Sequence, residues 1–376
     1  MATTTAQAPI TAKQGRLLRV VKWVFLLLLG LIVLAAICGA AYQAIANYRD
    51  GLRFPQEGRS VPLGAAFPGV SLNMNCTGLA AGGPTVVLDT GLGVPAVGWD
   101  LVQPQVAGFA RVCSYDRAGY GWSTAGPMPR TSGEIAKELH ALLVAAGEKP
   151  PYVLVAHSFG GYNVRVYTKE YPSEVAGMVL VDTSHEDQNS RMPGTLKDFM
   201  KQQSKQLETQ RKLAPYLMFF GIARLMGGEQ DPTGKLPKDF VKKMNYLILQ
   251  TKFVDATASE IGSFETSAAE VRAAGNLGDR PLVVLTAGKS ADPKQLPPGI
   301  DKRDLEELQR IWINELQVAE MHLSTRGKRQ IVEDSTHLIP FERPDTVVAA
   351  IREVCEAVKA GQAEPAQATT GATGVK

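Results

Sequence analysis

Short β-branched and apolar runs alternate along this 376-residue chain with segments whose apolar residues recur at helical spacing. This alternation predicts an α/β fold in which helices cover a mostly parallel sheet. Residues Ser132–Ala146 illustrate a helical segment, because Thr131 and Glu134 can form a capping box in front of it. Further helices are predicted over Gly160–Glu170 and Asp345–Ala360. The predicted strands are Val70–Asn75, Thr85–Leu88, Arg111–Tyr115, Tyr152–Ala156, Met178–Val181, Leu282–Thr286 and Gln330–Val332.

One interval, residues 184–280, interrupts the alternation because it has no strand-like run. It has amphipathic helical patterns instead, at Leu196–Lys212, Tyr216–Met226 and Phe240–Val254. An insertion at the carboxyl ends of parallel strands stands where ligands bind in such sheets. We therefore expect a helical cap over an active site. The alternative is a set of ordinary helices packed on the faces of the sheet.

Residues 23–46 carry no charge, and they are numerous enough to cross about 30 Å of hydrocarbon as a helix. Basic residues precede this run, and the first acidic residue, Asp50, follows it. The positive-inside bias predicts a single-pass anchor in the cell membrane, with a cytoplasmic N-terminus and an extracytoplasmic main domain. Three alternatives are a cleaved signal peptide, a lipoprotein modified at Cys38, and a buried core helix.

The net charge argues against nucleic-acid binding, and the spacing of the cysteines argues against a metal site. Without the four basic residues before the apolar run, the net charge of +3 drops to about −1, which offers no field for nucleic acid. No pair among the four cysteines has the spacing of metal ligands, so no metal site is predicted. The predicted organisation is a cytoplasmic tail at 1–22, a transmembrane helix at 23–46, a linker at 47–64, a core at 65–183 and 281–360, a cap at 184–280 and a disordered tail at 361–376.

The predicted strand at Tyr152–Ala156 runs directly into Ala-His-Ser-Phe-Gly-Gly and then into a helix. Serine is a weak nucleophile, so its hydroxyl must project toward a base from a sharp turn between strand and helix. Small residues at 156 and 160 allow the strand and the helix to approach closely. This segment resembles the G-x-S-x-G nucleophile elbow of the α/β-hydrolases, with Ala156 in place of the first glycine. The resemblance implies that Ser158 is the nucleophile.

Two further segments resemble the same family. Tyr115–Ser123 is similar to its D-x-x-G-x-G-x-S segment, and Val87–Gly93 is similar to its oxyanion-hole turn, with Thr90 where many members have histidine. The match implies an oxyanion hole formed by the backbone N–H groups of Leu92 and Phe159. It also implies the α/β-hydrolase fold, a mostly parallel eight-stranded sheet flanked by helices, here with a helical cap and an N-terminal transmembrane helix.

The base is expected after the last strand, where Ser335–Pro340 resembles the histidine loop of the family and offers His337. The acid stays open. Asp292 follows Leu282–Thr286, which corresponds to the seventh strand of the family and is the usual place, although it is one residue further from its glycine than is common. Asp182 follows Met178–Val181, which corresponds to the sixth strand of the family, where some members take their acid, and Asp187 is a third candidate.

The resemblance implies hydrolysis of an ester-type acyl bond by a Ser-His-Asp triad through an acyl-enzyme, with no metal or organic cofactor. Apolar residues of the cap favour a small, mainly apolar substrate. Alternatives are an acyltransferase or perhydrolase, a carbon–carbon-bond hydrolase, and a catalytically silent, membrane-tethered binding protein. The predicted strands Val70–Asn75 and Arg111–Tyr115 correspond to the second and fourth strands of the family, which are neighbours in its sheet, so a disulfide between Cys76 and Cys113 is a further hypothesis.

Overall fold

The computed structural model describes residues 12–79, 82–227, 231, 233–290 and 299–363. The chain divides into two units. The first contains residues 1–53 together with 215–228, and the second contains 54–214 and 229–376. The second unit holds the sheet and is described first.

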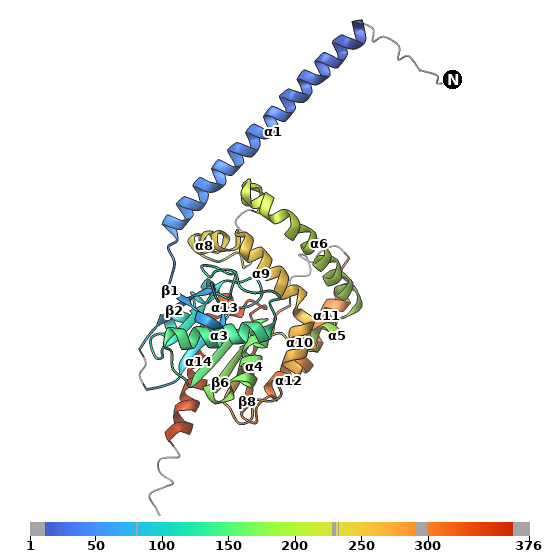
Figure 1. The fold of residues 1–376 in the computed structure, drawn as a ribbon. Helices are drawn as coiled ribbons and strands as arrows, with labels where there is room; N and C mark the ends of the chain where they lie inside the picture. Colours follow the sequence, from blue (N-terminus) through green and yellow to red (C-terminus); the bar gives the residue numbers. More distant parts are fainter. Residues whose placement is uncertain (1–11, 80–81, 228–230, 232, 291–298, 364–376) are drawn as a thin grey trace, which may run out of the picture. The chain divides into compact units, whose positions relative to one another are not determined.

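The second unit is built on an eight-stranded sheet in the order β1-β2-β4-β3-β5-β6-β7-β8 (Figure 1). β2 pairs antiparallel with β1 and with β4, whereas β3 to β8 all run parallel to one another. The predicted mostly parallel sheet is therefore confirmed. The strands are β1 (Arg59–Pro62), β2 (Ser71–Thr77), β3 (Thr85–Asp89), β4 (Val112–Tyr115), β5 (Tyr152–His157), β6 (Val175–Val181), β7 (Leu282–Ala287) and β8 (Gly327–Val332).

Helices cover both faces of this sheet, because its central strands bury side chains on both sides. Val87 packs into one core cluster with residues of α3 and α4, while its neighbours Val86 and Leu88 pack into another with residues of α2 and α14. The helices of these two layers are α2 (Gln103–Val106), α3 (Ser132–Ala146), α4 (Gly160–Glu170) and α14 (Pro344–Ala363). In α3, Thr131 accepts a hydrogen bond from the Glu134 N–H, as the capping box predicts.

Within the described part of 184–280 the chain is helical and has no strand. The pattern expected as one helix over Phe240–Val254 is two helices, because the backbone leaves the helical region at Leu249 and Gln250. The helices here are α5 (Gln188–Arg191), α6 (Gly194–Phe219), α7 (Ile222–Gly227), α8 (Lys238–Ile248), α9 (Thr251–Gly262) and α10 (Phe264–Arg272). Beyond β7 come α11 (Lys302–Ile311), the π-helix η5 (Trp312–Leu316), α12 (Gln317–Met321) and, after β8, α13 (Ile339–Glu342).

The first unit contains α1 (Ala12–Arg53), which is long and apolar enough to cross a membrane. α1 extends beyond the predicted span of 23–46, and it takes up the first part of the linker expected at 47–64. Nothing breaks the helix before Arg53, and Pro55 then excludes its continuation. The rest of that linker contains β1, which sequence patterns missed because Val61 is its only buried residue. The tail expected at 361–376 lies outside the described residues from 364 onward.

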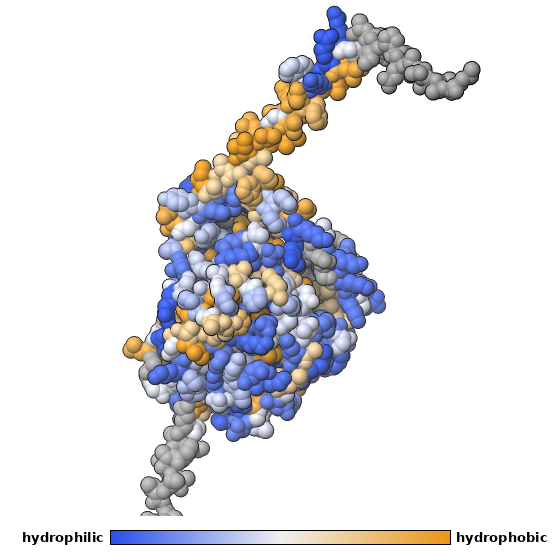
Figure 2. All heavy atoms as spheres, in the orientation of Figure 1, coloured by the Kyte–Doolittle hydropathy of each residue, from blue (hydrophilic) through white to orange (hydrophobic). Residues whose placement is uncertain are grey.

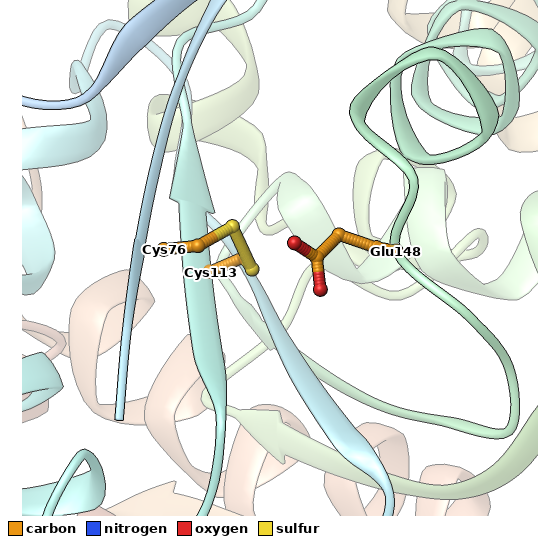
Figure 3. A group of neighbouring side chains, drawn as sticks. All are labelled: Cys76, Cys113 and Glu148. Atoms are coloured by element: carbon orange, nitrogen blue, oxygen red, sulfur yellow. A yellow bond between two sulfur atoms is a disulfide. The ribbon is translucent and has the colours of Figure 1, made fainter. Parts of the chain in front are cut away.

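Cys76 and Cys113 are directly opposite each other in the antiparallel pair β2–β4, and they form a disulfide (Figure 3). The hypothesis of a bond between them is confirmed. The Glu148 carboxylate points toward the two sulfur atoms, but both of its oxygens accept hydrogen bonds from Arg111, at 2.6 and 2.7 Å. The disulfide and this ion pair together account for the cluster of potential metal ligands at this edge of the sheet.

Candidate active site

Ser158 occupies the turn between β5 and α4, with a left-handed backbone conformation (φ 53°) that is rare for a residue with a side chain. The turn is tight because a Cβ at Gly160 would lie only 2.8 Å from the carbonyl oxygen of Thr90 and 2.9 Å from that of Asp89. Ala156 and Gly160 are the small residues that the elbow requires. This conformation presents the Ser158 hydroxyl at the carboxyl end of the sheet.

A continuous hydrogen-bonded chain joins Ser158, His337 and Asp182. His337, in the loop between β8 and α13, places its Nε2 2.9 Å from Ser158 Oγ and its Nδ1 2.6 Å from Asp182 Oδ2. The His337 side chain is 47% exposed, whereas that of Asp182 is 3% exposed. A serine, a histidine that is open to substrate and a buried acid have the geometry needed to activate the serine hydroxyl.

Asp182 is fixed by further contacts at the end of β6. Its Oδ1 accepts hydrogen bonds from the Ala287 N–H and from the indole N–H of Trp312, both at 2.9 Å. Its own backbone is left-handed, with φ 45°. Burial by itself raises the pKa of this carboxyl, but the hydrogen bonds from His337, Trp312 and Ala287 outweigh it and hold the pKa below its ordinary value. Asp182 therefore stays ionised beside His337.

Sequence reasoning missed Trp312. This residue opens the π-helix η5, and such local widening of a helix is frequent at functional sites. Neither the π-helix nor the direction of the indole can be read from a pattern of apolar residues. The only signal in the sequence is a large polar-tipped aromatic residue after a charged helix, which is too general to indicate a contact with Asp182.

Asp187, the third candidate for the acid, forms an exposed ion pair with Arg272 at 3.0 Å. Asp292 lies outside the described residues. His185, which also follows β6, contacts its own loop and α4, because its Nδ1 accepts a hydrogen bond from the Asp187 N–H and its carbonyl accepts one from the Tyr162 hydroxyl.

His157, the variable residue of the elbow, has a contact that sequence reasoning did not assign. Its Nε2 lies 2.8 Å from the carbonyl oxygen of His337, to which it donates a hydrogen bond. Burial, together with the neighbouring His337, lowers the pKa of His157 to about 3. His157 is thus a neutral donor that holds the backbone of the His337 loop against the elbow.

The predicted oxyanion-hole residues, Leu92 and Phe159, line the same cavity as Ser158. In the described part of the chain neither of their backbone N–H groups donates a hydrogen bond to a protein acceptor. Gly91 allows the turn to approach Ser158, because a Cβ there would lie 3.0 Å from Ser158 Cβ and 3.1 Å from His157 Nδ1. Two unengaged N–H groups beside the serine can donate hydrogen bonds to a developing negative charge.

A buried arginine fixes the turn that carries Leu92. Arg117 donates to the carbonyl oxygens of Thr90 and Gly91, at 2.8 and 3.0 Å, and to Asp89 at 2.9 Å. It also forms two hydrogen bonds with Glu260 of α9, at 2.8 and 2.9 Å. Arg117 therefore links residues 90–93, here called the oxyanion turn after their predicted role, to a helix of the 184–280 interval.

A cavity of about 610 Å³ opens over Ser158. Residues of the elbow, of α6 and of α9–α10 line it, so helices of the 184–280 interval form part of its wall. Its apolar lining comes from Leu92, Phe159, Met192, Met200, Ile261 and Phe264. Lys197, Lys201 and Glu265 are its charged members.

Comparison with known proteins gives three kinds of match. A sequence model described as the alpha/beta hydrolase family matches residues 86–350. Among curated proteins, the chain is 35% identical over 100 residues to the uncharacterized protein YqjL of Bacillus subtilis, covering 27% of this chain and 40% of that protein. It is 25% identical over 305 residues to the probable transporter efuK of Hormonema carpetanum, covering 74% and 40%. The chain thus spans less than half the length of these relatives.

Solved structures share the fold. A thermophilic esterase from Thermogutta terrifontis matches with a TM-score of 0.52 and 22% identity, covering 80% of this chain and 98% of the esterase. Cfl2 from Burkholderia cenocepacia matches with a TM-score of 0.55 and 19% identity, covering 77% and 93%. These likenesses concern the fold alone.

Proposed function

The chain belongs to the alpha/beta hydrolase family, and on that premise we propose that it is a serine hydrolase that cleaves an ester-type acyl bond in a small, mainly apolar substrate. One observation carries this proposal. Ser158 Oγ, His337 and Asp182 are joined by hydrogen bonds of 2.9 and 2.6 Å at the mouth of an apolar cavity. The hydrogen-bonded geometry is that of a nucleophile, a general base and an orienting acid.

In the first half of the reaction, Ser158 Oγ attacks the carbonyl carbon of the substrate while His337 Nε2 takes the hydroxyl proton. Asp182 accepts the hydrogen bond from Nδ1–H and stabilises the imidazolium that forms. The N–H groups of Leu92 and Phe159 donate hydrogen bonds to the oxyanion of the tetrahedral intermediate. His337 then protonates the leaving alcohol, and the acyl group remains on Ser158.

In the second half, water replaces the alcohol. His337 takes a proton from the water, the hydroxide attacks the acyl carbon, and the same N–H groups hold the second oxyanion. Collapse of this intermediate returns the proton to Ser158 and releases a carboxylic acid. The chain's own residues supply each of these proton transfers.

The lining of the cavity supports the choice of substrate. Phe159, Phe264 and Met200 present apolar groups in the cavity over Ser158, and burial of an acyl or aryl group against them is favourable by about 25 cal/mol for each Å² of apolar surface. The cavity volume suits a small molecule rather than a folded protein.

We further propose that α1 anchors the protein in the cell membrane with the hydrolase domain outside the cytoplasm. Lys13, Arg16, Arg19 and Lys22 precede the apolar run, which favours a cytoplasmic N-terminus. The Cys76–Cys113 disulfide supports the same orientation, because such bonds persist in oxidising compartments.

The test is labelling of the detergent-solubilised full chain with a fluorophosphonate probe, followed by mass-spectrometric mapping of the modified residue. We expect a single adduct on Ser158, lost in His337→Ala and kept in the control His140→Ala, whose imidazole contacts Glu174 away from the cavity. A folded protein that takes no adduct would contradict the proposal and favour a catalytically silent binding protein. Product analysis with added alcohol or peroxide then separates hydrolysis from acyl transfer or perhydrolysis, and a diketone substrate tests carbon–carbon-bond cleavage.

A further inference from the structure

The first unit carries an exposed apolar surface apart from α1 itself. Residues 215–227, here called the 215–227 segment, comprise the end of α6, a turn at Gly221 and α7. An exposed cluster of large apolar side chains marks a surface that contacts another protein or a membrane. In this segment they are Tyr216 (65% exposed), Phe219 (64%), Ile222 (38%), Leu225 (69%) and Met226 (80%).

Hydrogen bonds attach this segment to α1. Arg224 donates to Asp50 at 2.5 Å, to Asn47 at 2.9 Å and to Gln43 at 3.3 Å. Arg224 is the only charged residue in the segment, and Asp50 pairs with it. The segment therefore has no charge without a partner that would oppose its transfer to an apolar environment.

Close backbone packing adds to this attachment. A Cβ at Gly39 of α1 would collide with the carbonyl oxygen of Phe220, so only glycine permits the approach. Gly221 has φ 71°, which reverses the chain between α6 and α7, and it lies against Tyr42. The two helical pieces are thereby held against α1 between residues 39 and 50.

The position of these contacts along α1 indicates how far the 215–227 segment lies from the hydrocarbon core of a membrane that α1 would span. A helix needs about 20 residues to cross the roughly 30 Å hydrocarbon core. If the span starts at Trp23, directly after the basic residue Lys22, a helix of about 20 residues ends near Tyr42. Contacts at Gly39 and Tyr42 thus fall at the membrane boundary, and the polar partners Asn47 and Asp50 fall just outside it. Figure 2 shows that the surface of α1 is largely apolar along its length.

We propose that the 215–227 segment lies in the membrane interface beside α1 and buries its exposed apolar side chains among lipid. An amphipathic segment of this kind binds through buried apolar area and lies in the plane of the interface. The proposal rests on the proposed anchoring by α1 and adds a second contact with the bilayer. It assigns the lipid surface, rather than a second protein, as the partner of these side chains.

Site-directed fluorescence in lipid nanodiscs tests the proposal on the full chain. In a Cys38→Ser background, where Cys355 is buried and Cys76 is bonded to Cys113, a polarity-sensitive maleimide is attached at Leu225→Cys. Ile32→Cys reports the span of α1, and Val144→Cys is the matched control, because Val144 is an apolar residue that is 64% exposed on α3 of the other unit. Phosphatidylcholine brominated on its acyl chains is the lipid quencher, and iodide is the aqueous quencher.

We expect brominated lipid to quench the probes at Leu225 and Ile32, and iodide to quench the probe at Val144. A probe at Leu225 that behaves like the one at Val144, while Ile32 is quenched by lipid, would overturn the interfacial segment but keep the anchor. Loss of lipid quenching at Ile32 would overturn both. Fluorophosphonate labelling of Ser158 in the same samples reports the hydrolase separately.

A charge reversal at Arg224 provides a second test of the proposal. Arg224→Glu sets a carboxylate against Asp50, so we expect lipid quenching at Leu225 to fall. Arg211→Glu is the matched control, since Arg211 forms an exposed pair with Asp255 in the other unit. Equal quenching at Leu225 in both variants would contradict a segment held at the interface by its contact with α1.

Discussion

Arg117 and Glu260 form a buried, two-pronged ion pair, with hydrogen bonds of 2.8 and 2.9 Å, between the segment that follows β4 and helix α9. Both side chains are almost fully removed from solvent. Because Arg117 also holds the carbonyl groups of Thr90 and Gly91, the pair connects the oxyanion turn with the helices over the cavity. The position of Leu92 therefore depends on a residue more than 160 positions away in the sequence.

Glu260→Gln should destabilise the protein by about 3–5 kcal/mol, because it leaves part of the Arg117 charge buried without its partner. It should also lower kcat for ester hydrolysis, since the oxyanion turn loses its support. Thermal unfolding and esterase kinetics measure the two effects. Asp255→Asn on the same helix is the control, because its pair with Arg211 is exposed and should contribute at most about 1 kcal/mol. Equal destabilisation in both variants would contradict the prediction.

Asp182→Asn should lower kcat by about 10⁴ with little change in KM, because the amide favours the wrong tautomer of His337. Steady-state kinetics and the rate of fluorophosphonate labelling check this. Asp187→Asn should keep nearly full activity, since Asp187 pairs with Arg272 on the surface. An equally large loss in Asp187→Asn or Asp292→Asn, with Asp182→Asn active, would assign the acid to another residue.

Trp312→Phe removes one of the donors to Asp182 Oδ1 and keeps most of the aromatic volume. One hydrogen bond to a charged group is worth about 1.5 kcal/mol, so kcat/KM should fall roughly tenfold. Trp99→Phe is the matched control, because the Trp99 indole N–H has no hydrogen-bond partner among the described residues. Its activity per folded molecule should be unchanged, and a similar loss there would argue against a specific role for the Trp312 indole.

Glu320→Gln should change how stability depends on pH. Burial raises the pKa of Glu320 to about 8, whereas the unfolded chain releases this proton at an ordinary carboxyl pKa. Between these two values the folded state holds the extra proton, so wild-type stability falls as the pH rises, by about 1.4 kcal/mol per pH unit.

The glutamine cannot titrate, so the variant should gain stability relative to the wild type from pH 5 to pH 8. Thermal unfolding at a series of pH values is the measurement. Glu306→Gln, an exposed position paired with Lys302, should show no such trend. Parallel curves for wild type and Glu320→Gln would show that Glu320 is ionised in the folded protein.

Replacement of both Cys76 and Cys113 by alanine should cost about 3–4 kcal/mol, because the bond closes a loop of sequence separation 37 in the unfolded chain. The exposed control Cys38→Ser should leave the unfolding free energy unchanged. Thiol titration of denatured, unreduced protein should find two free thiols, on Cys38 and Cys355. A count of four would contradict the disulfide.

Local patterns predicted most of the fold. Each predicted strand overlaps an observed one, because strands buried in a sheet are rich in β-branched and apolar residues and can be recognised by that composition. β1, the break at Gly221 within the helical pattern expected over Tyr216–Met226, and the break between α8 and α9 were missed. A four-residue edge strand has almost no apolar content, and the chain direction at Leu249 is decided by packing rather than by propensity.

Ser158, His337 and the two predicted oxyanion residues could be named as candidates from local patterns, because the elbow, the histidine loop and the glycine turn are continuous segments whose residue types reflect local geometry. The apolar span of α1 was equally readable. The contact of Asp182 with His337, the hydrogen bonds from Trp312 and Ala287 to Asp182, and the attachment of the 215–227 segment to α1 by Arg224 became visible in the folded chain alone. These contacts join residues more than 100 positions apart, and their formation depends on strand order and helix packing. A local pattern of side chains cannot predict which distant residues will come into contact.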